Sequence, residues 1–178
     1  VEHDEETMRR ADYIIERGIY DTAQSAALSA CGAANSNWAI NIDQYLAGSN
    51  NSYGLSCGAA LPAQGSSDVL VIRRASEAVP AQLNTSRVYV QTSRIQGSLF
   101  VPACTEPLNT SCIPPNYAPP ASQSRQLVVH GYYVSSRSTA SDQIPSLRRK
   151  VLGNVNAGSA AIEDQEVVAG VEDLQIQF

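Results

Sequence analysis

The sequence has little charge, few aromatic residues and no long apolar run. Charged residues make up 16% of its 178 residues, against a usual share of about 25%. Ser, Thr, Asn and Gln supply most of the polarity, which is typical of exported β-rich proteins. No stretch approaches the ~20 apolar residues that a helix needs to cross a bilayer. Hydrophobic residues still make up 43%, which excludes wholesale disorder, and the length predicts a single domain over residues 1–178.

The chain also lacks a start methionine and a signal peptide. It opens with Val1–Asp4, which predicts a processed or trimmed segment of a longer gene product. Its net charge of −5 is unevenly spread, because residues 1–21 carry seven acids against three Arg and residues 163–178 carry five acids and no base. The acidic total argues against a dedicated nucleic-acid binder, although the basic middle of the chain leaves room for one basic face.

The four cysteines do not have the spacing of a zinc site. Zinc sites favour short C-x2–4-C knuckles, and 25, 46 and 7 residues separate Cys31, Cys57, Cys104 and Cys112. Disulfides formed in an oxidising compartment fit better than four buried free thiols. Three pairings are formally possible. We favour Cys31–Cys57 and Cys104–Cys112, because each bond would close a segment that lacks a helix or strand pattern.

Residues 5–30 predict one amphipathic helix. An apolar stripe recurs at spacings of three and four, formed by Met8, Ala11, Ile15, Ile19, Thr22 and Ala26. Asp4 is a suitable N-cap, and Gly32 is a suitable stop. Residues 32–67 are rich in Gly, Ser, Asn and Ala and predict an irregular region. The helix would lie on the core of the domain.

Strand patterns fill most of residues 68–178. They cover residues 68–73, 87–91, 98–101, 126–135, 147–152 and 165–178, the last with a break near Gly170. Residues 102–124 hold six of the nine prolines and predict a tethered loop. One helix followed only by strands predicts an α+β fold, in which the N-terminal helix packs on an antiparallel β-sheet and disulfides staple the loops.

No catalytic motif has the context it needs. Residues 54–58 read G-x-S-x-G around Ser56, but a nucleophile elbow lies between a strand and a helix, and neither is predicted there. His130 lies inside a predicted strand without a nucleophile or an orienting carboxylate nearby in the sequence. No phosphate loop or dinucleotide fingerprint occurs. We therefore expect neither an enzyme nor a cofactor.

Two charged runs are candidate contact sites. The acidic run at residues 163–166, followed by Glu172–Asp173, lacks the pattern of a calcium loop, so it predicts a solvated acidic turn and no metal site. The basic run Arg148, Arg149 and Lys150 is a candidate contact for partner proteins or DNA, with a solvated strand face as the simpler alternative. Opposite charges on the two runs would suit contacts between different subunits.

Several segments resemble PilW-type minor pilins of type IV pili. Residues 8–20, followed by Cys31, resemble the distal half of the long N-terminal helix of that family, and residues 67–73 resemble its first strand. Residues 131–134, 144–149 and 167–178 resemble later strands, in the same order and at similar spacing. The last block is the most specific. Together these segments cover about half of the chain.

The resemblance implies a pilin-like fold and a structural function. A minor pilin primes assembly of the pilus (fimbrium) or sits at its tip, and its partners are other minor pilins, major pilins and in some cases a tip adhesin. Its hydrophobic half-helix, processed and methylated as in other prepilins, anchors an inner-membrane pool facing the periplasm before the subunit reaches the surface pilus. Such pili serve adhesion, twitching motility or DNA uptake.

Two related functions remain open at this point. One is a ligand-binding tip module, either an adhesin or a DNA-uptake subunit, and the other is a pseudopilin of type II secretion, which has the same plan. The sequence departs from the family because the hydrophobic half-helix is missing and because relatives continue past Phe178 with at least one more strand. We expect the residues upstream of Val1 to contain the ~20 apolar positions of that half-helix.

Overall fold

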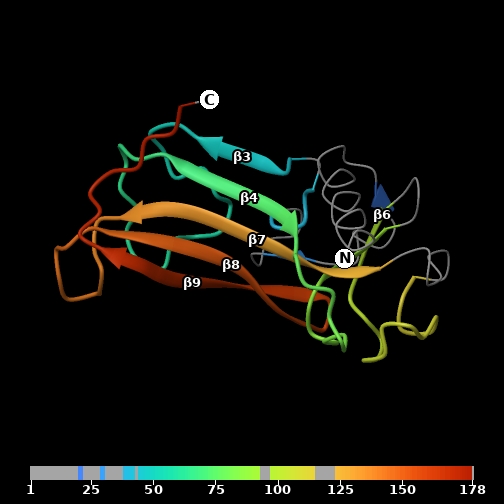
Figure 1. Ribbon diagram of the computed structural model, residues 1–178. Helices are drawn as coiled ribbons and strands as arrows, with labels where there is room; N and C mark the ends of the chain where they lie inside the picture. The colour runs from blue at the N-terminus through green and yellow to red at the C-terminus, as the bar shows by residue number, and fades with distance from the viewer. Residues whose placement is uncertain are drawn as a thin grey trace.

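A five-stranded antiparallel sheet forms the body of the protein (Figure 1). The computed structural model describes residues 20–21, 29–30, 38–42, 44–92, 97–114 and 123–177. The strands of the sheet, in spatial order, are β3 (Leu46–Ser49), β4 (Val69–Ala75), β7 (Ser124–Ser135), β8 (Ser146–Asn156) and β9 (Ser159–Ala169).

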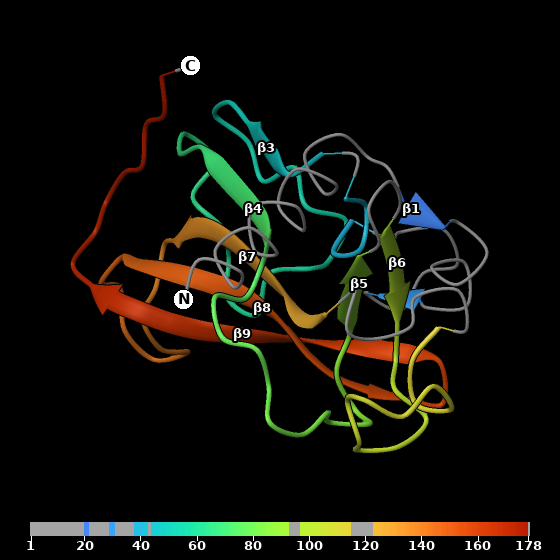
Figure 2. The same ribbon diagram turned by 45° about the vertical axis from the view of Figure 1, so that its right-hand side comes forward.

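A smaller group of strands branches from the start of β7 (Figure 2). β5 (Tyr89–Thr92) pairs antiparallel with β6 (Gly97–Phe100) and with residues 124–126 of β7. Two short strands add in parallel, β1 (Tyr20–Asp21) to β6 and β2 (Ser29–Ala30) to the start of β9. β7 therefore belongs to both groups and joins them.

The antiparallel sheet confirms the β part of the predicted fold, but the predicted helix over residues 5–30 is wrong at four positions. Tyr20–Asp21 and Ser29–Ala30 are strand residues, and the rest of that helix lies outside the described residues. The irregular character of residues 32–67 holds for most of its described part. The exception is β3, a four-residue strand. It contains a Gly and a Ser, so the sequence shows no strand pattern there.

The strands predicted from residue 68 onward all exist, but the last one is displaced. β8 and β9 form a hairpin whose two turn residues, Ala157 and Gly158, both have positive φ, at 47° and 78°. This is the backbone of a type I′ turn, which twists with the strands on either side. β9 therefore starts at Ser159 and ends before Gly170, whose φ is 85°. Residues 171–177 are not in a strand.

Alternation along β4 and β7 gives the sheet one covered face, which we call the inner face. Its buried side chains include Val69, Val71, Leu127, Val129 and Tyr133. Residues 38–42 and 53–63 cover it, with Ala39, Ile40 and Ile42 buried against the sheet. A Cβ at Gly131 would meet Leu55 and Trp38 at 3.4 Å, so the absence of a side chain there lets the covering segment approach β7 closely.

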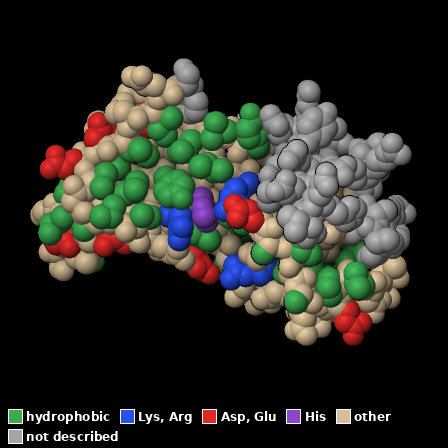
Figure 3. Space-filling model, in the orientation of Figure 1, with side chains coloured by type: hydrophobic (Ala, Val, Ile, Leu, Met, Phe, Trp, Pro, Cys, Tyr) green, Lys and Arg blue, Asp and Glu red, His purple; other side chains and the backbone are tan. Residues whose placement is uncertain are grey.

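No segment among the described residues covers the opposite face, which we call the open face. Directly paired residues project to the same side of a sheet, and the ladder pairs Ile72 with His130 and His130 with Val151, and likewise Leu70 with Tyr132 and Tyr132 with Arg149. These side chains are only partly buried. Figure 3 shows apolar side chains spread over β3, β4 and β7, with the histidine and basic side chains among them.

A disulfide closes the Pro-rich loop as expected. Cys104 and Cys112 are bonded, with their Cα atoms 4.8 Å apart, which confirms this half of the favoured pairing. Cys112 and Ile113 pack with Leu83, Tyr89 and Phe100 in a second, smaller core cluster. Cys57 is also disulfide-bonded, and its expected partner, Cys31, lies outside the described residues. The Cys104–Cys112 bond therefore holds the loop against β5 and β6, in a segment where prolines limit strand pairing.

We expect the double variant Cys104→Ala, Cys112→Ala to unfold with a free energy lower by about 2.5 kcal/mol, because the bond restricts the unfolded chain over a short loop. Urea unfolding of the variant and the oxidised parent protein measures the difference. Peptide mapping of the parent under non-reducing conditions is the control, and recovery of Cys104 linked to Cys57 would contradict the pairing.

Candidate functional site

A buried carboxylate lies at the centre of a polar cluster on the inner face. Asp164 projects from β9, and its side chain is 9% exposed. Its two oxygens accept four hydrogen bonds, from Tyr133 Oη (2.7 Å), Arg148 Nε (2.8 Å), Lys150 Nζ (3.0 Å) and the backbone N–H of Ala60 (3.1 Å). Strands β7, β8 and β9 and the covering segment thus meet at one side chain.

The same cluster fastens residues 53–60 to the sheet. Lys150 Nζ also donates to the carbonyl oxygen of Gly58 at 2.8 Å, and Tyr53 Oη donates to the carbonyl oxygen of Cys57 at 2.6 Å. The rings of Tyr53 and Tyr133 meet edge to face, with centroids 5.1 Å apart. Because this segment has no regular secondary structure, these side-chain contacts hold it on the sheet, as backbone hydrogen bonds hold neighbouring strands together elsewhere.

Electrostatics keep Asp164 ionised. Burial raises the pKa of its carboxyl, but the hydrogen bonds from Tyr133, Arg148, Lys150 and Ala60 outweigh burial and lower the pKa to about 2. Burial and the bond to Asp164 raise the pKa of Tyr133. Neither group is poised to exchange a proton near neutral pH. The cluster is therefore suited to holding the fold together.

The basic run at residues 148–150 does not form one surface patch. Arg148 and Lys150 are 8% and 3% exposed on the inner face, where they pair with Asp164. Arg149 projects to the open face and donates from Nη2 to Gln165 Oε1 at 2.8 Å. The sequence reading of one continuous patch is wrong because successive residues of a strand point to opposite sides. Only Arg149 is placed to meet a partner on the open face.

The acidic run at residues 163–166 is not a solvated turn, because it lies inside β9. Asp164 faces inward, and Glu166 Oε2 lies 3.8 Å from Arg148 Nη1 at the margin of the cluster. Glu172 and Asp173 follow the strand and are exposed. Of these acids, sequence reasoning missed the buried role of Asp164. Its position, two residues from Ile162 in the alternating pattern of a strand, was the available signal.

The open face combines apolar side chains with cations. His130 lies at its centre, its ring edge to face with that of Tyr132 at a centroid distance of 6.0 Å. Burial, and then the charges of Arg149 and Arg74, lower the pKa of His130, so the two arginines supply the positive charge of the face. Glu163, which pairs with Val151 on β8, adds an acid at its β9 edge. Such a face suits an apolar partner with acidic residues.

The structure does not bring Ser56 and His130 together. Ser56 is exposed in the segment over the inner face, next to Leu55, which packs at Gly131. His130 projects to the open face, on the other side of β7. The two side chains of a nucleophile and base would have to lie within hydrogen-bond reach of each other. Described residues on both sides of Ser56 lack the strand and helix of a nucleophile elbow.

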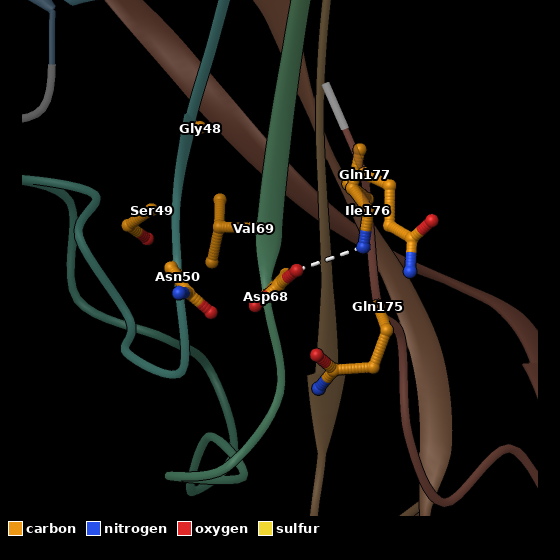
Figure 4. Close-up of a pocket in the computed structure, with 8 residues that line it drawn as sticks. All are labelled: Gly48, Ser49, Asn50, Asp68, Val69, Gln175, Ile176 and Gln177. Atoms are coloured by element: carbon orange, nitrogen blue, oxygen red, sulfur yellow. Dashed lines mark hydrogen bonds between the residues drawn. The ribbon is translucent and has the colours of Figure 1, made fainter.

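A groove of about 440 Å³ lies where the C-terminal segment crosses the start of β4 (Figure 4). Asp68 anchors it, since its carboxylate accepts from the backbone N–H groups of Asn51 and Ile176, both at 2.8 Å. The N–H of Asp68 donates to the carbonyl oxygen of Leu174 at 2.8 Å. Gln175 and Gln177 line the groove with Gly48–Asn50. Sequence reasoning missed this role of Asp68.

Two further kinds of site are missing from the described part of the chain. No three of its His, Cys, Asp and Glu side chains gather as metal ligands. None of its residues forms a helix with the length and hydrophobicity of a membrane span. Comparison with protein-family models, curated proteins and solved structures finds no match to this chain.

Proposed function

We propose that this protein is the globular part of a minor pilin subunit, which primes assembly of a type IV pilus or sits at its tip. The open face is the single observation that carries the proposal. It presents a broad apolar area with two arginines, as a surface for packing against protein does. The resemblance to PilW-type minor pilins supports the same conclusion.

In this proposal the N-terminal segment packs on the open face as the amphipathic helix. Residues 1–21 carry seven acids against three Arg, which complements Arg74 and Arg149 on the face. The stripe that runs from Met8 to Ile19 would cover Leu70, Ile72 and Val151. The fold would then be α+β, with the helix confined to residues before Tyr20, where β1 begins.

The outer surface of the subunit then makes the contacts with neighbouring pilins. Glu172 and Asp173 are exposed beyond the end of β9, and Glu166, 38% exposed, lies within its last four residues. These acids suit a basic patch on a different minor or major pilin. The subunit would wait in the inner membrane, facing the periplasm, until it joins the surface pilus. Catalysis has no part in this function.

We expect charge reversal at the acids beyond β9 to reduce piliation. In the source bacterium with the gene deleted, a plasmid copy carrying Glu172→Lys and Asp173→Lys should restore several-fold fewer surface pili than the parent gene, because the contact with a basic partner is lost. Sheared pili are measured by immunoblot against the cellular level of folded subunit.

The matched control is the same charge reversal at Glu77, an exposed acid in the loop after β4, together with Ser56→Ala. Both should restore pili fully. A deletion strain with normal pili would contradict the proposal, and loss of type II secretion without loss of pili would indicate a pseudopilin. Loss of pili in the Ser56→Ala strain would instead favour a hydrolase.

A second candidate, a DNA-capturing tip module, rests on the same face. Tyr132, His130 and the two arginines offer aromatic and cationic groups side by side, as surfaces that bind single strands do. Salt-sensitive retention of the purified chain on DNA, lost on changing Arg74 and Arg149 to Ala, would favour this candidate. The predominance of aliphatic side chains around them favours protein as the partner.

A further inference from the structure

β3 is an edge strand whose outer backbone groups have no strand beside them in the described part of the chain (Figure 1). The N–H of Arg73 donates to the carbonyl oxygen of Tyr45, which fixes the pattern of the ladder. Ala47 and Ser49 therefore bond to β4, and the N–H and C=O groups of Leu46 and Gly48 point outward. Leu46 is 43% exposed and Tyr45 is 44% exposed.

The two edge strands of the five-stranded sheet, β3 and β9, differ in how well they are protected from pairing with another chain. β9 carries Glu163, Asp164 and Glu166, its ladder with β8 has two register shifts, and β2 covers its start. Charges and irregularities of this kind are how natural edges avoid pairing with other chains. Residues 44–56 beside and after β3 contain no charge and no proline. β3 is short, at four residues, but it carries no charge, no proline and no register shift in its ladder with β4.

We infer that β3 pairs with β3 of a second copy of this chain, antiparallel about a two-fold axis that passes between the Ala47 residues of the two copies. In the register that sets Leu46 against Gly48 of the second copy, the outward N–H and C=O groups of both residues are all satisfied. The Leu46 side chain then covers Gly48 of the other copy, where no side chain competes for the space.

Charge supports a second copy as the occupant of this edge. The chain has a net charge of −5, so two copies repel each other at the acidic β9 and C-terminal surfaces and meet least repulsion at the uncharged β3. A two-fold contact closes on itself and does not propagate. The open faces of both copies would join on one side, since Leu46 shares that face with Ile72.

The contact is expected to be weak. A four-residue edge buries much less than the roughly 1,200 Å² of a stable complex, so the dimer should form between about 10 µM and about 1 mM. Sedimentation velocity of the full 178-residue chain over that range should show a monomer–dimer equilibrium. Amide exchange at Leu46 and Gly48 should slow as concentration rises, while exchange at Ala47 and Ser49, already bonded to β4, should not change.

Two variants test the register. Gly48→Pro removes an outward donor without touching the bonds to β4, and Leu46→Lys places a charge at the edge. Each should weaken dimerisation by about tenfold or more, whereas Leu108→Lys, the same change at a residue 77% exposed in the disulfide loop, should not. A chain that stays monomeric, or a dimer that survives both variants, would overturn the inference. The purified chain suffices, so the outcome is independent of the pilus assay.

Discussion

Asp164→Asn should lower the free energy of unfolding by about 3–5 kcal/mol, because it leaves Lys150 as a buried cation without a counter-charge and leaves Arg148 with only the more distant Glu166. The amide cannot accept all four hydrogen bonds that the carboxylate accepts. Loss of the bond to Ala60 should also release residues 53–60 from the sheet. Urea unfolding measures the free energy, and faster amide exchange at Ala60 reports the release.

The matched control is Glu166→Gln, which neutralises the other acid near Arg148. Glu166 is 38% exposed and lies 3.8 Å from the guanidinium, so its loss should cost under about 1 kcal/mol. Replacing Asp164, Arg148 and Lys150 together with apolar residues of similar size should recover much of the stability. Equal effects of the two single substitutions would contradict the central place of Asp164.

The dependence on pH gives a further check on the same carboxylate. The pKa of Asp164 is about 2 in the folded state, below the value of about 3.9 in an unfolded chain. Its contribution, on the order of 2 kcal/mol, is complete above the unfolded value and is lost as pH falls through the folded one. Between pH 5 and pH 2 the parent protein should lose more stability than Asp164→Asn does.

Ile72→Glu should reduce surface pili by about thirtyfold while leaving the sheet folded. Ile72 lies near the centre of the open face. If the substitution removes about 2 kcal/mol of binding free energy at this face, assembly should fall by about thirtyfold. A carboxylate there would also repel the acidic N-terminal segment proposed to cover the face. Sheared pili are measured by immunoblot, and near-ultraviolet circular dichroism of the purified variant reports the packing of the sheet.

The control for this substitution is Ile144→Glu, at an aliphatic side chain 53% exposed in the loop before β8. It should leave pili unchanged. Equal piliation by both variants would contradict the use of the open face in assembly, and unfolding of Ile72→Glu in isolation would show that the face is already covered more tightly than its partial burial indicates.

The sequence predicted most of the sheet, because strand patterns depend on neighbouring residues. The alternation along Val69–Ala75 and Ser124–Ser135 survives in the structure as an inner and an open face. β9 was displaced because the turn at Ala157 and Gly158 has an Ala where Asn or Asp is the usual signal. β3 escaped notice because its stability comes from β4, more than twenty residues further along the chain.

The candidate sites were less predictable, since they depend on contacts between distant segments. Arg148, Arg149 and Lys150 form one run in the sequence, yet they divide between two faces as soon as the segment is a strand. No local pattern could show that Asp164 would accept a bond from Ala60, 104 residues earlier. The disulfide Cys104–Cys112 was predictable because a short closed loop is itself a local feature.

The pairing of β4 with β7 has a consequence for synthesis of the chain. The 48 residues between Ala75 and Ser124 must leave the ribosome before β4 meets its partner, a delay of about 2–10 s. During that time β3 can pair with only one edge of the apolar run Val69–Ile72, and the other edge is open to association with other nascent chains. Asp68 at one end and Arg73 and Arg74 at the other are gatekeeper charges, which discourage such association. Asp68 anchors the C-terminal segment in the finished protein, and Arg73 Nε donates to the carbonyl oxygen of Trp38 in the covering segment at 2.7 Å. These two residues thus also protect the unfinished chain.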